Sequence, residues 1–149
     1  MKPCVIEIAL TIPDNEAYTA MTTLRRLGTE ISDLQRADVW RFETEDGYEA
    51  ALIDRMRTLE TIYNPNKHEL RERGAVPEAG EVWIHEIAHG EEPGEGPVRI
   101  AGRTLPGVNG IERFTVWRLA DEAGAPAPAE AVARATETLL CNPAFQVAT

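Results

Sequence analysis

The stretch RLGTEISDLQRADVWR, residues 26–41, returns later in the chain as RTLPGVNGIERFTVWR, residues 103–118. Trp117 follows Trp40 by 77 residues, and every identity between the two stretches keeps this spacing. The identical pairs are Arg26 and Arg103, Arg36 and Arg113, Val39 and Val116, Trp40 and Trp117, and Arg41 and Arg118. A fixed spacing of this kind indicates an internal repeat.

The repeat extends to both sides of these stretches. Upstream, the apolar run at residues 5–12 corresponds to residues 82–89, and downstream RTLETIYNP (57–65) corresponds to ATETLLCNP (135–143). The second match places Asn64-Pro65 over Asn142-Pro143. The sequence therefore predicts a duplication, with copies at residues 1–76 and 77–149 joined near residues 73–80. Two organisations are compatible with this repeat: two small units, one for each copy, or one compact domain that contains both copies.

Within the first copy, the pattern predicts a strand, a helix, a strand and a second helix. A β-branched run at residues 4–12 ends at Pro13, and Asp14 is placed to N-cap a helix that stops at Gly28. A second strand follows at residues 34–43. After the turn at residues 45–47, apolar residues at helical spacing predict a helix from Tyr48 to Asn64, where Pro65 ends it.

The second copy keeps this order with one change. Residues 90–102, GEEPGEGPVRIAG, replace the first helix, and they contain too much Gly and Pro to be helical. We therefore predict that this helix is lost. The later helix is clearer, because Pro126 and Pro128 precede a stripe of Val132, Ala135 and Leu139, and Pro143 follows it.

Composition excludes several classes of partner. A net charge of −10 and few basic clusters argue against nucleic acid. No apolar run approaches the ~20 residues that a membrane helix needs, and the N-terminus does not resemble a signal peptide, so we expect a cytoplasmic protein. Cys4 and Cys141 are far apart in sequence, and in a reducing cytosol such thiols are usually small core residues.

The segment His85-Glu86-Ile87-Ala88-His89 matches the zinc protease pattern H-E-x-x-H. That chemistry needs a helix, whereas the apolar run before His85 and the Gly after His89 favour a strand. On a strand the two His would stand about 13 Å apart, too far to share one ion. A metal site at His85 and His89 is therefore the weaker alternative. His68, just past a predicted helix, is expected to be solvated.

The sequence contains no G-x-G-x-x-G, Walker A, G-x-S-x-G or C-x-x-C motif. We therefore predict no catalytic, cofactor-binding or metal-binding residue. Trp40 and Trp117 could form a stacking platform for a ring, but their recurrence favours equivalent packing sites. The repeat-signature residues that we expect to be structural are Trp40, Arg41, Asn64, Pro65, Trp117, Arg118, Asn142 and Pro143.

The element order resembles that of the PurS family, the small subunits of phosphoribosylformylglycinamidine synthase. The resemblance rests on a helix closing on Leu27-Gly28, a strand containing Asp33-Leu34, an acidic helix, and the final Leu140-Cys141-Asn142-Pro143. PurS proteins are about half as long, non-catalytic and dimeric through strand pairing. They bridge the ATP-using synthase subunit and the glutaminase subunit. Where the family has Gly-Lys in its second strand, this chain has Ala37-Asp38 and Phe114-Thr115.

The resemblance implies an α+β fold of two ferredoxin-like units, with antiparallel sheets joined across a pseudo-twofold axis. It also implies an accessory subunit of an ATP-dependent amidoligase complex in purine biosynthesis, with no catalysis and no cofactor of its own. Its partners would be the synthase and glutaminase subunits, or further copies of the chain. A stand-alone small-molecule-binding protein or enzyme and a zinc-dependent hydrolase through His85 and His89 stay open as alternatives.

Overall fold

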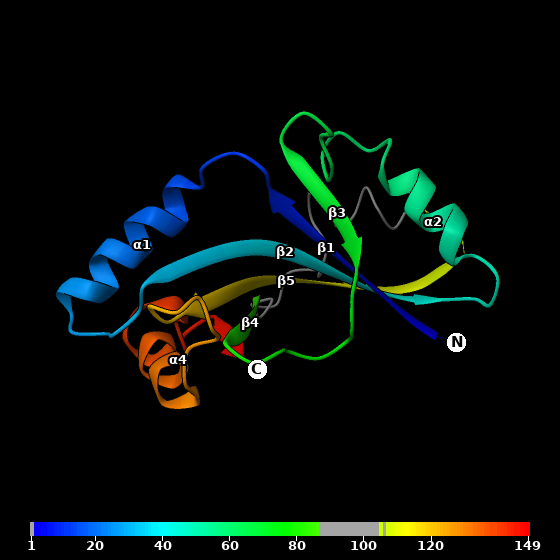
Figure 1. Cartoon of the computed structure of the whole chain (residues 1–149). Coiled ribbons are helices and arrows are strands. Elements are labelled where there is room, and N and C mark those ends of the chain that lie inside the picture. Colours follow the sequence, from blue (N-terminus) through cyan, green and yellow to red (C-terminus); the bar gives the residue numbers. More distant parts are fainter. Residues whose placement is uncertain (1, 87–104, 106) are drawn as a thin grey trace. The chain divides into compact units, whose positions relative to one another are not determined.

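The computed structural model describes residues 2–86, 105 and 107–149. Strands and helices alternate from β1 to β3, and β4 and β5 then follow β3 before the last helix (Figure 1). The strands are β1 (Lys2–Leu10), β2 (Asp33–Thr44), β3 (His68–Glu72), β4 (Glu81–Glu86), β5 (Val108–Ala120) and β6 (Gln146–Ala148). The helices are α1 (Asn15–Arg26), α2 (Glu49–Met56) and α4 (Ala129–Ala135), the last continued by a π-helical turn, η1 (Thr136–Leu140). The predicted α+β class is confirmed.

The strands form one antiparallel sheet in the order β3-β1-β2-β5-β4-β6. In terms of the sequence repeat, β4, β5 and β6 are the counterparts of β1, β2 and β3, so the order reads the same from either edge. At the centre, the Ser32 N–H bonds to the Ala120 carbonyl at 2.9 Å and the Glu45 N–H to the Gly107 carbonyl at 3.0 Å. The first of these contacts lies within unit 2 and the second within unit 1.

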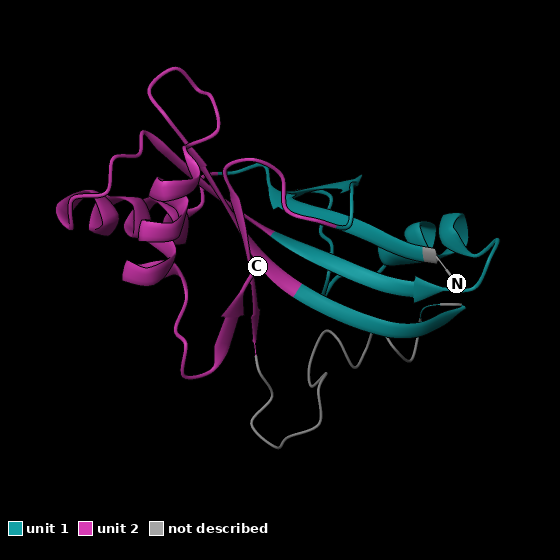
Figure 2. Ribbon diagram, turned by 90° about the horizontal axis from the view of Figure 1, so that it is seen from below, with its two compact units in different colours: residues 1–12, 38–75, 88–113 teal, residues 13–37, 76–87, 114–149 magenta. Residues whose placement is uncertain are grey.

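Two compact units divide the chain, and each contains segments from both sequence copies (Figure 2). Unit 1 comprises residues 1–12, 38–75 and 88–113, and unit 2 comprises residues 13–37, 76–87 and 114–149. Helix α1, which belongs to the first copy, therefore packs in the unit that holds the helices of the second copy. The copies defined by the sequence are thus not the compact units of the fold.

Unit 1 is built around one apolar cluster. Its buried members come mainly from β1, β2 and α2, namely Cys4, Ile6, Ile8, Trp40, Phe42, Leu52, Met56, Ile62 and Leu105. The prediction that α2 continues to Asn64 is wrong, because the helix ends at Met56. There the Thr58 N–H bonds to the Arg55 carbonyl, three residues back, and the Thr58 hydroxyl donates to the same oxygen at 2.7 Å. The side chain thus stabilises a tight turn in place of another helical turn.

Unit 2 has a core of its own, and α1 covers part of it. The buried members are Leu24, Ile31, Leu34, Val82, Ile84, Leu119, Ala127, Ala135 and Leu140. As predicted, Asp14 caps α1, because its Oδ1 accepts hydrogen bonds from the N–H groups of Glu16 (3.0 Å) and Ala17 (3.1 Å). Gly28 follows the helix with φ +89°, a conformation that glycine adopts without strain.

The last helix begins after Pro128, as the sequence predicts. Its final turn is η1, where each hydrogen bond spans one residue more than in an α-helix. This wider turn rotates the following side chains, so Leu140 is buried while Leu139 is exposed. The predicted apolar stripe through Leu139 is therefore wrong at its last position.

No helix among the described residues is long and apolar enough to cross a membrane. The predicted loss of a helix at residues 90–102 and the second His of the H-E-x-x-H pattern lie outside the described residues.

Candidate functional site

Each Trp of the repeat lies against an arginine from the other sequence copy. The Arg113 guanidinium carbon is 5.4 Å from the centre of the Trp40 ring, and that of Arg36 is 6.0 Å from the Trp117 ring. Both distances are within the range of cation–π attraction. Since Arg36 corresponds to Arg113 and Trp40 to Trp117, the two copies exchange the same contact.

These two stacks differ in their surroundings. Trp40 is 1% exposed and stacks on Phe42 with ring centres 6.1 Å apart, which confirms it as a core residue. Trp117 is half-buried at the margin of the unit 2 core. The prediction of equivalent packing sites holds for the arginine partners and fails for the burial, because different segments surround the two rings.

The carboxylates that hold the two arginines also differ. In unit 2, Arg36 Nε and Nη2 donate to the two oxygens of Asp14 at 3.1 and 3.3 Å, and its Nη1 forms an ion pair with Glu16. In unit 1, Arg113 Nη2 donates to Asp38 Oδ2 at 3.0 Å in an exposed ion pair. Because Asp14 also caps α1, Arg36 is linked to the start of that helix.

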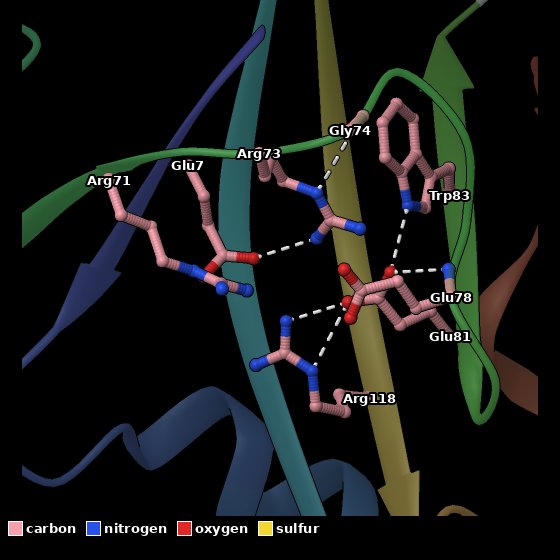
Figure 3. Close-up of polar contacts among 8 residues, drawn as sticks. All are labelled: Glu7, Arg71, Arg73, Gly74, Glu78, Glu81, Trp83 and Arg118. Carbon is pink, nitrogen blue, oxygen red and sulfur yellow. Dashed lines mark hydrogen bonds and ion pairs between the residues drawn. The ribbon is translucent and has the colours of Figure 1, made fainter.

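A buried carboxylate lies on β1 of unit 1. Glu7 is 3% exposed and accepts hydrogen bonds from Arg71 Nε at 2.7 Å and from Arg73 Nη1 at 2.9 Å (Figure 3). Arg71 is the residue directly opposite Glu7 in the β1–β3 ladder. The Arg73 side chain is only 1% exposed. Charge-assisted bonds of this kind compensate the cost of burying the carboxylate.

A second buried carboxylate lies on β4 of unit 2. The side chain of Glu81 is fully buried, and Arg118 donates to its Oε2 through Nη2 at 2.6 Å and Nε at 3.1 Å (Figure 3). Its Oε1 accepts from the Glu78 N–H at 2.9 Å and from Trp83 Nε1 at 3.4 Å. Arg118 stands directly opposite Glu81 in the β4–β5 ladder. Both oxygens of this carboxylate accept hydrogen bonds. This arrangement suits a role in holding β4 against β5 better than a role in proton transfer.

The other arginine of the repeat signature, Arg41, has weaker contacts. Its Nη2 lies 3.7 Å from Glu43 Oε1, and within the described residues its buried Nε has no hydrogen-bond partner. Arg41 and Arg118 thus share a repeat position, but only Arg118 is paired with a buried carboxylate.

The two Asn-Pro pairs form matching turns before the outer strands. Asn64 Oδ1 accepts from the Asn66 N–H at 2.9 Å, and Asn142 Oδ1 accepts from the Ala144 N–H at 3.0 Å. In each turn the Asn N–H donates to a side chain four residues on. The predicted structural role of Asn64, Pro65, Asn142 and Pro143 is consistent with these turns.

The acceptor of this last bond differs between the copies. In the first copy it is His68 Nδ1, at 2.9 Å from the Asn64 nitrogen, and in the second it is Gln146 Oε1, at 2.8 Å from the Asn142 nitrogen. The expectation that His68 is merely solvated is wrong, because its half-buried ring takes part in this turn. Burial and the neighbouring Lys67 lower the pKa of His68 from 6.5, while Asp38 acts in the opposite direction.

His85 lies on strand β4, as its sequence context predicts. Its ring packs against Phe114, with ring centres 5.0 Å apart. No group of three or more His, Cys, Asp or Glu side chains that could hold a metal ion occurs in the described part of the chain.

The Cys4 thiol is a poor nucleophile. Burial, reinforced by the negative charges of Glu72 and Glu49, raises the pKa of Cys4 to about 11. At neutral pH the thiol is therefore protonated, and its place in the unit 1 core confirms the expected packing role. Both cysteines are free.

Unit 2 contains several hollows at its surface. One, of about 930 Å³, lies between residues 28–32, 121–123 and the start of α4, and its lining combines Glu30, Asp121, Glu122 and Glu130 with Arg134. Another, of about 420 Å³, lies between α1 and η1 and is lined by Trp117, Leu139 and polar residues of α1. One of the two repeat Trp residues, Trp117, thus borders a hollow.

No sequence motif singles out Glu7 or Glu81. Glu7 is the single carboxylate of β1, and Glu81 begins the apolar run of β4; a carboxylate buried in such a setting needs a cationic partner. The signal available for Glu7 was Arg71 on the edge strand β3 together with Arg73 just after its end. Comparison with protein-family models and with curated proteins found no match to this chain.

Proposed function

We propose that this chain is a PurS-like accessory subunit of phosphoribosylformylglycinamidine synthase, in which two tandem copies act as a dimer made from one chain. Without catalytic residues of its own, it would bridge the ATP-using synthase subunit and the glutaminase subunit in purine biosynthesis. The observation that carries the proposal is the exchanged pair of stacks, Arg113 on Trp40 and Arg36 on Trp117. Two subunits related by a twofold axis exchange contacts in this reciprocal way.

The strand order supports the same reading. Counterpart strands occupy equivalent places in the strand order on either side of the central β2–β5 pair. This is the order expected when two ferredoxin-like units join their sheets across a pseudo-twofold axis. In such an assembly the outer strands β3 and β6 are the edges offered to partner subunits.

The two outer strands differ in their suitability for pairing. Strand β3 has the sequence HELRE, and charged side chains along an edge oppose the addition of another strand. Strand β6 has the uncharged sequence QVA, and Val147 is 48% exposed. Thr149 and Trp83 exchange both of their backbone hydrogen bonds, at 2.9 and 3.0 Å. By the antiparallel alternation, the N–H of the preceding Ala148 faces outward and is available to a partner strand.

The test of the bridging function uses the purified chain with the synthase and glutaminase subunits of the same organism. We expect the three to co-elute, and we expect glutamine-dependent synthesis to require the chain while ammonia-dependent synthesis does not. If the chain elutes alone and glutamine-dependent synthesis is the same with and without it, the proposal is wrong.

The test of the edge uses Ala148→Pro, with Ala148→Ser as its matched control. Proline removes the outward N–H without removing a bond to β4, whereas serine keeps it. We expect Ala148→Pro to weaken assembly with the partner subunits and Ala148→Ser to leave it unchanged. Equal assembly by both variants would exclude β6 as the docking edge.

A second candidate function, the binding of a small molecule in unit 2, is favoured by the hollow beside Trp117. A ring-containing ligand could stack on the indole there. The test is thermal denaturation against a panel of nucleotides and amino acids. A ligand that raises the melting temperature of the native chain but not of a folded Trp117→Ala variant would support this function, and the absence of any such shift would count against it.

A further inference from the structure

The Asn-Pro turns of the two copies are built alike except at one atom. In both, the Asn carbonyl accepts from the backbone N–H groups three and four residues on, with distances of 3.0 and 2.8 Å after Asn64 and of 3.2 and 2.8 Å after Asn142. In both, the Asn N–H donates to the side chain of the fourth residue. The acceptor atom is an imidazole nitrogen in the first copy and an amide oxygen in the second.

This difference decides how each turn responds to acid. A backbone N–H can only donate, so His68 Nδ1 must carry its lone pair and the ring must be neutral. Protonation places a second N–H opposite that of Asn64, and the hydrogen bond is lost. Gln146 does not titrate, so the turn of the second copy keeps its bond at any pH.

We propose that protonation of His68 opens the turn between α2 and β3, while Gln146 keeps the corresponding turn of the second copy closed. The consequence falls on a sheet edge, because His68 is the first residue of β3 and stands opposite Leu10 of β1. Beside it, the Lys67 carbonyl accepts from the Thr11 N–H at 2.9 Å. Opening the turn therefore loosens the first end of this edge strand.

The groups that face the imidazole are consistent with a neutral ring at pH 7. Lys67 adjoins it in the turn and disfavours a second positive charge, whereas Asp38 on β2 favours the charge. The ring centres of Tyr63 and His68 lie 6.2 Å apart, and the residue opposite His68 on β1 is the apolar Leu10. Burial and Lys67 outweigh Asp38, so the pKa of His68 is lowered from 6.5. The hydrogen bond from the Asn64 N–H to His68 Nδ1 is therefore fully formed above pH 6.5 and is lost as the pH falls through the lower pKa of the folded state.

The experiment measures hydrogen exchange at the Asn64 and Asn142 amides by NMR between pH 7.5 and 5, corrected for intrinsic exchange. In the native chain we expect protection of Asn64 to fall about threefold to tenfold in acid, the effect of losing one hydrogen bond. Protection of Asn142 should stay constant. In His68→Gln, which copies the turn of the second copy, Asn64 protection should also stay constant.

The reciprocal variant Gln146→His should transfer the acid dependence to Asn142. It also decides the question if His68→Gln does not fold. The other two histidines, His85 and His89, are unchanged in both variants, so their titration contributes equally. The proposal is overturned if Asn64 loses protection to the same extent in the native chain and in His68→Gln, or if Asn142 in Gln146→His is insensitive to pH.

Discussion

Trp40 and Trp117 hold the same position in the two copies of the repeat, yet they are buried to different extents. Trp40 stacks on Phe42 within the unit 1 core and is 1% exposed, whereas Trp117 borders a surface hollow in unit 2. Each keeps an arginine of the other copy over its ring. The reciprocal contact is thus preserved in both copies, while the packing around it has diverged.

The largest change in the free energy of unfolding is expected when each Trp is replaced by Ala. We expect Trp40→Ala to lower the free energy of unfolding by about 3–5 kcal/mol, because it removes a fully buried ring and leaves a cavity. Trp117→Ala should cost about 1–2 kcal/mol, since a partly exposed ring gives up less apolar area. Urea denaturation of both variants measures the difference.

The control for this pair is Phe at each position, which retains a ring of smaller volume. Trp40→Phe should recover a large part of the stability lost in Trp40→Ala. Equal losses for the two Ala variants would mean that the rings contribute alike and that their different burial has no energetic effect.

A smaller effect is expected at the carboxylates that hold the two arginines. Asp14→Ala removes the N-cap of α1 together with the ion pair to Arg36, and it should cost about 1–2 kcal/mol. Asp38→Ala removes only an exposed ion pair with Arg113, and it should cost less than about 0.5 kcal/mol. Thermal and urea denaturation distinguish these values.

Asp14→Asn separates the two roles of Asp14. Asparagine caps a helix about as well as aspartate, so this variant loses the negative charge that pairs with Arg36 and keeps the cap. We expect it to lie closer to the native chain than to Asp14→Ala. If Asp38→Ala lowers the free energy of unfolding as much as Asp14→Ala, the carboxylate partners of Arg36 and Arg113 contribute equally and the proposed difference between them is wrong.

Local rules predicted the elements well, as residues 13–28 illustrate. Pro13, Asp14 and Gly28 gave the end of β1, the cap of α1 and its stop, because each acts through bonds to near neighbours. The end of α2 was missed for the same physical reason. Thr58 competes for a helical carbonyl at Arg55, and this local bond ends the helix before the proline does.

Tertiary relations could not be predicted in this way. The stacking of Arg113 on Trp40 depends on the register of β2 against β5, which brings together positions far apart in sequence. The pairing of Glu81 with Arg118 depends on the β4–β5 register in the same way. The placement of α1 in unit 2 is a packing choice that its own sequence does not encode.

The smallest difference is expected at the turns where the copies have not diverged. Gly47 and Gly124 are repeat counterparts with φ +88° and +78°, and a Cβ added to either would meet no atom within 4 Å. Alanine at each should therefore cost only the backbone strain of a left-handed residue, about 1–2 kcal/mol, and the two values should agree. Asparagine tolerates this conformation and should recover part of the loss at both positions. Urea denaturation of the four variants gives the comparison. Unequal Ala values would mean that divergence between the copies reaches even the exposed turns, and the Trp and Asp differences could not then be assigned to packing around the exchanged stacks alone.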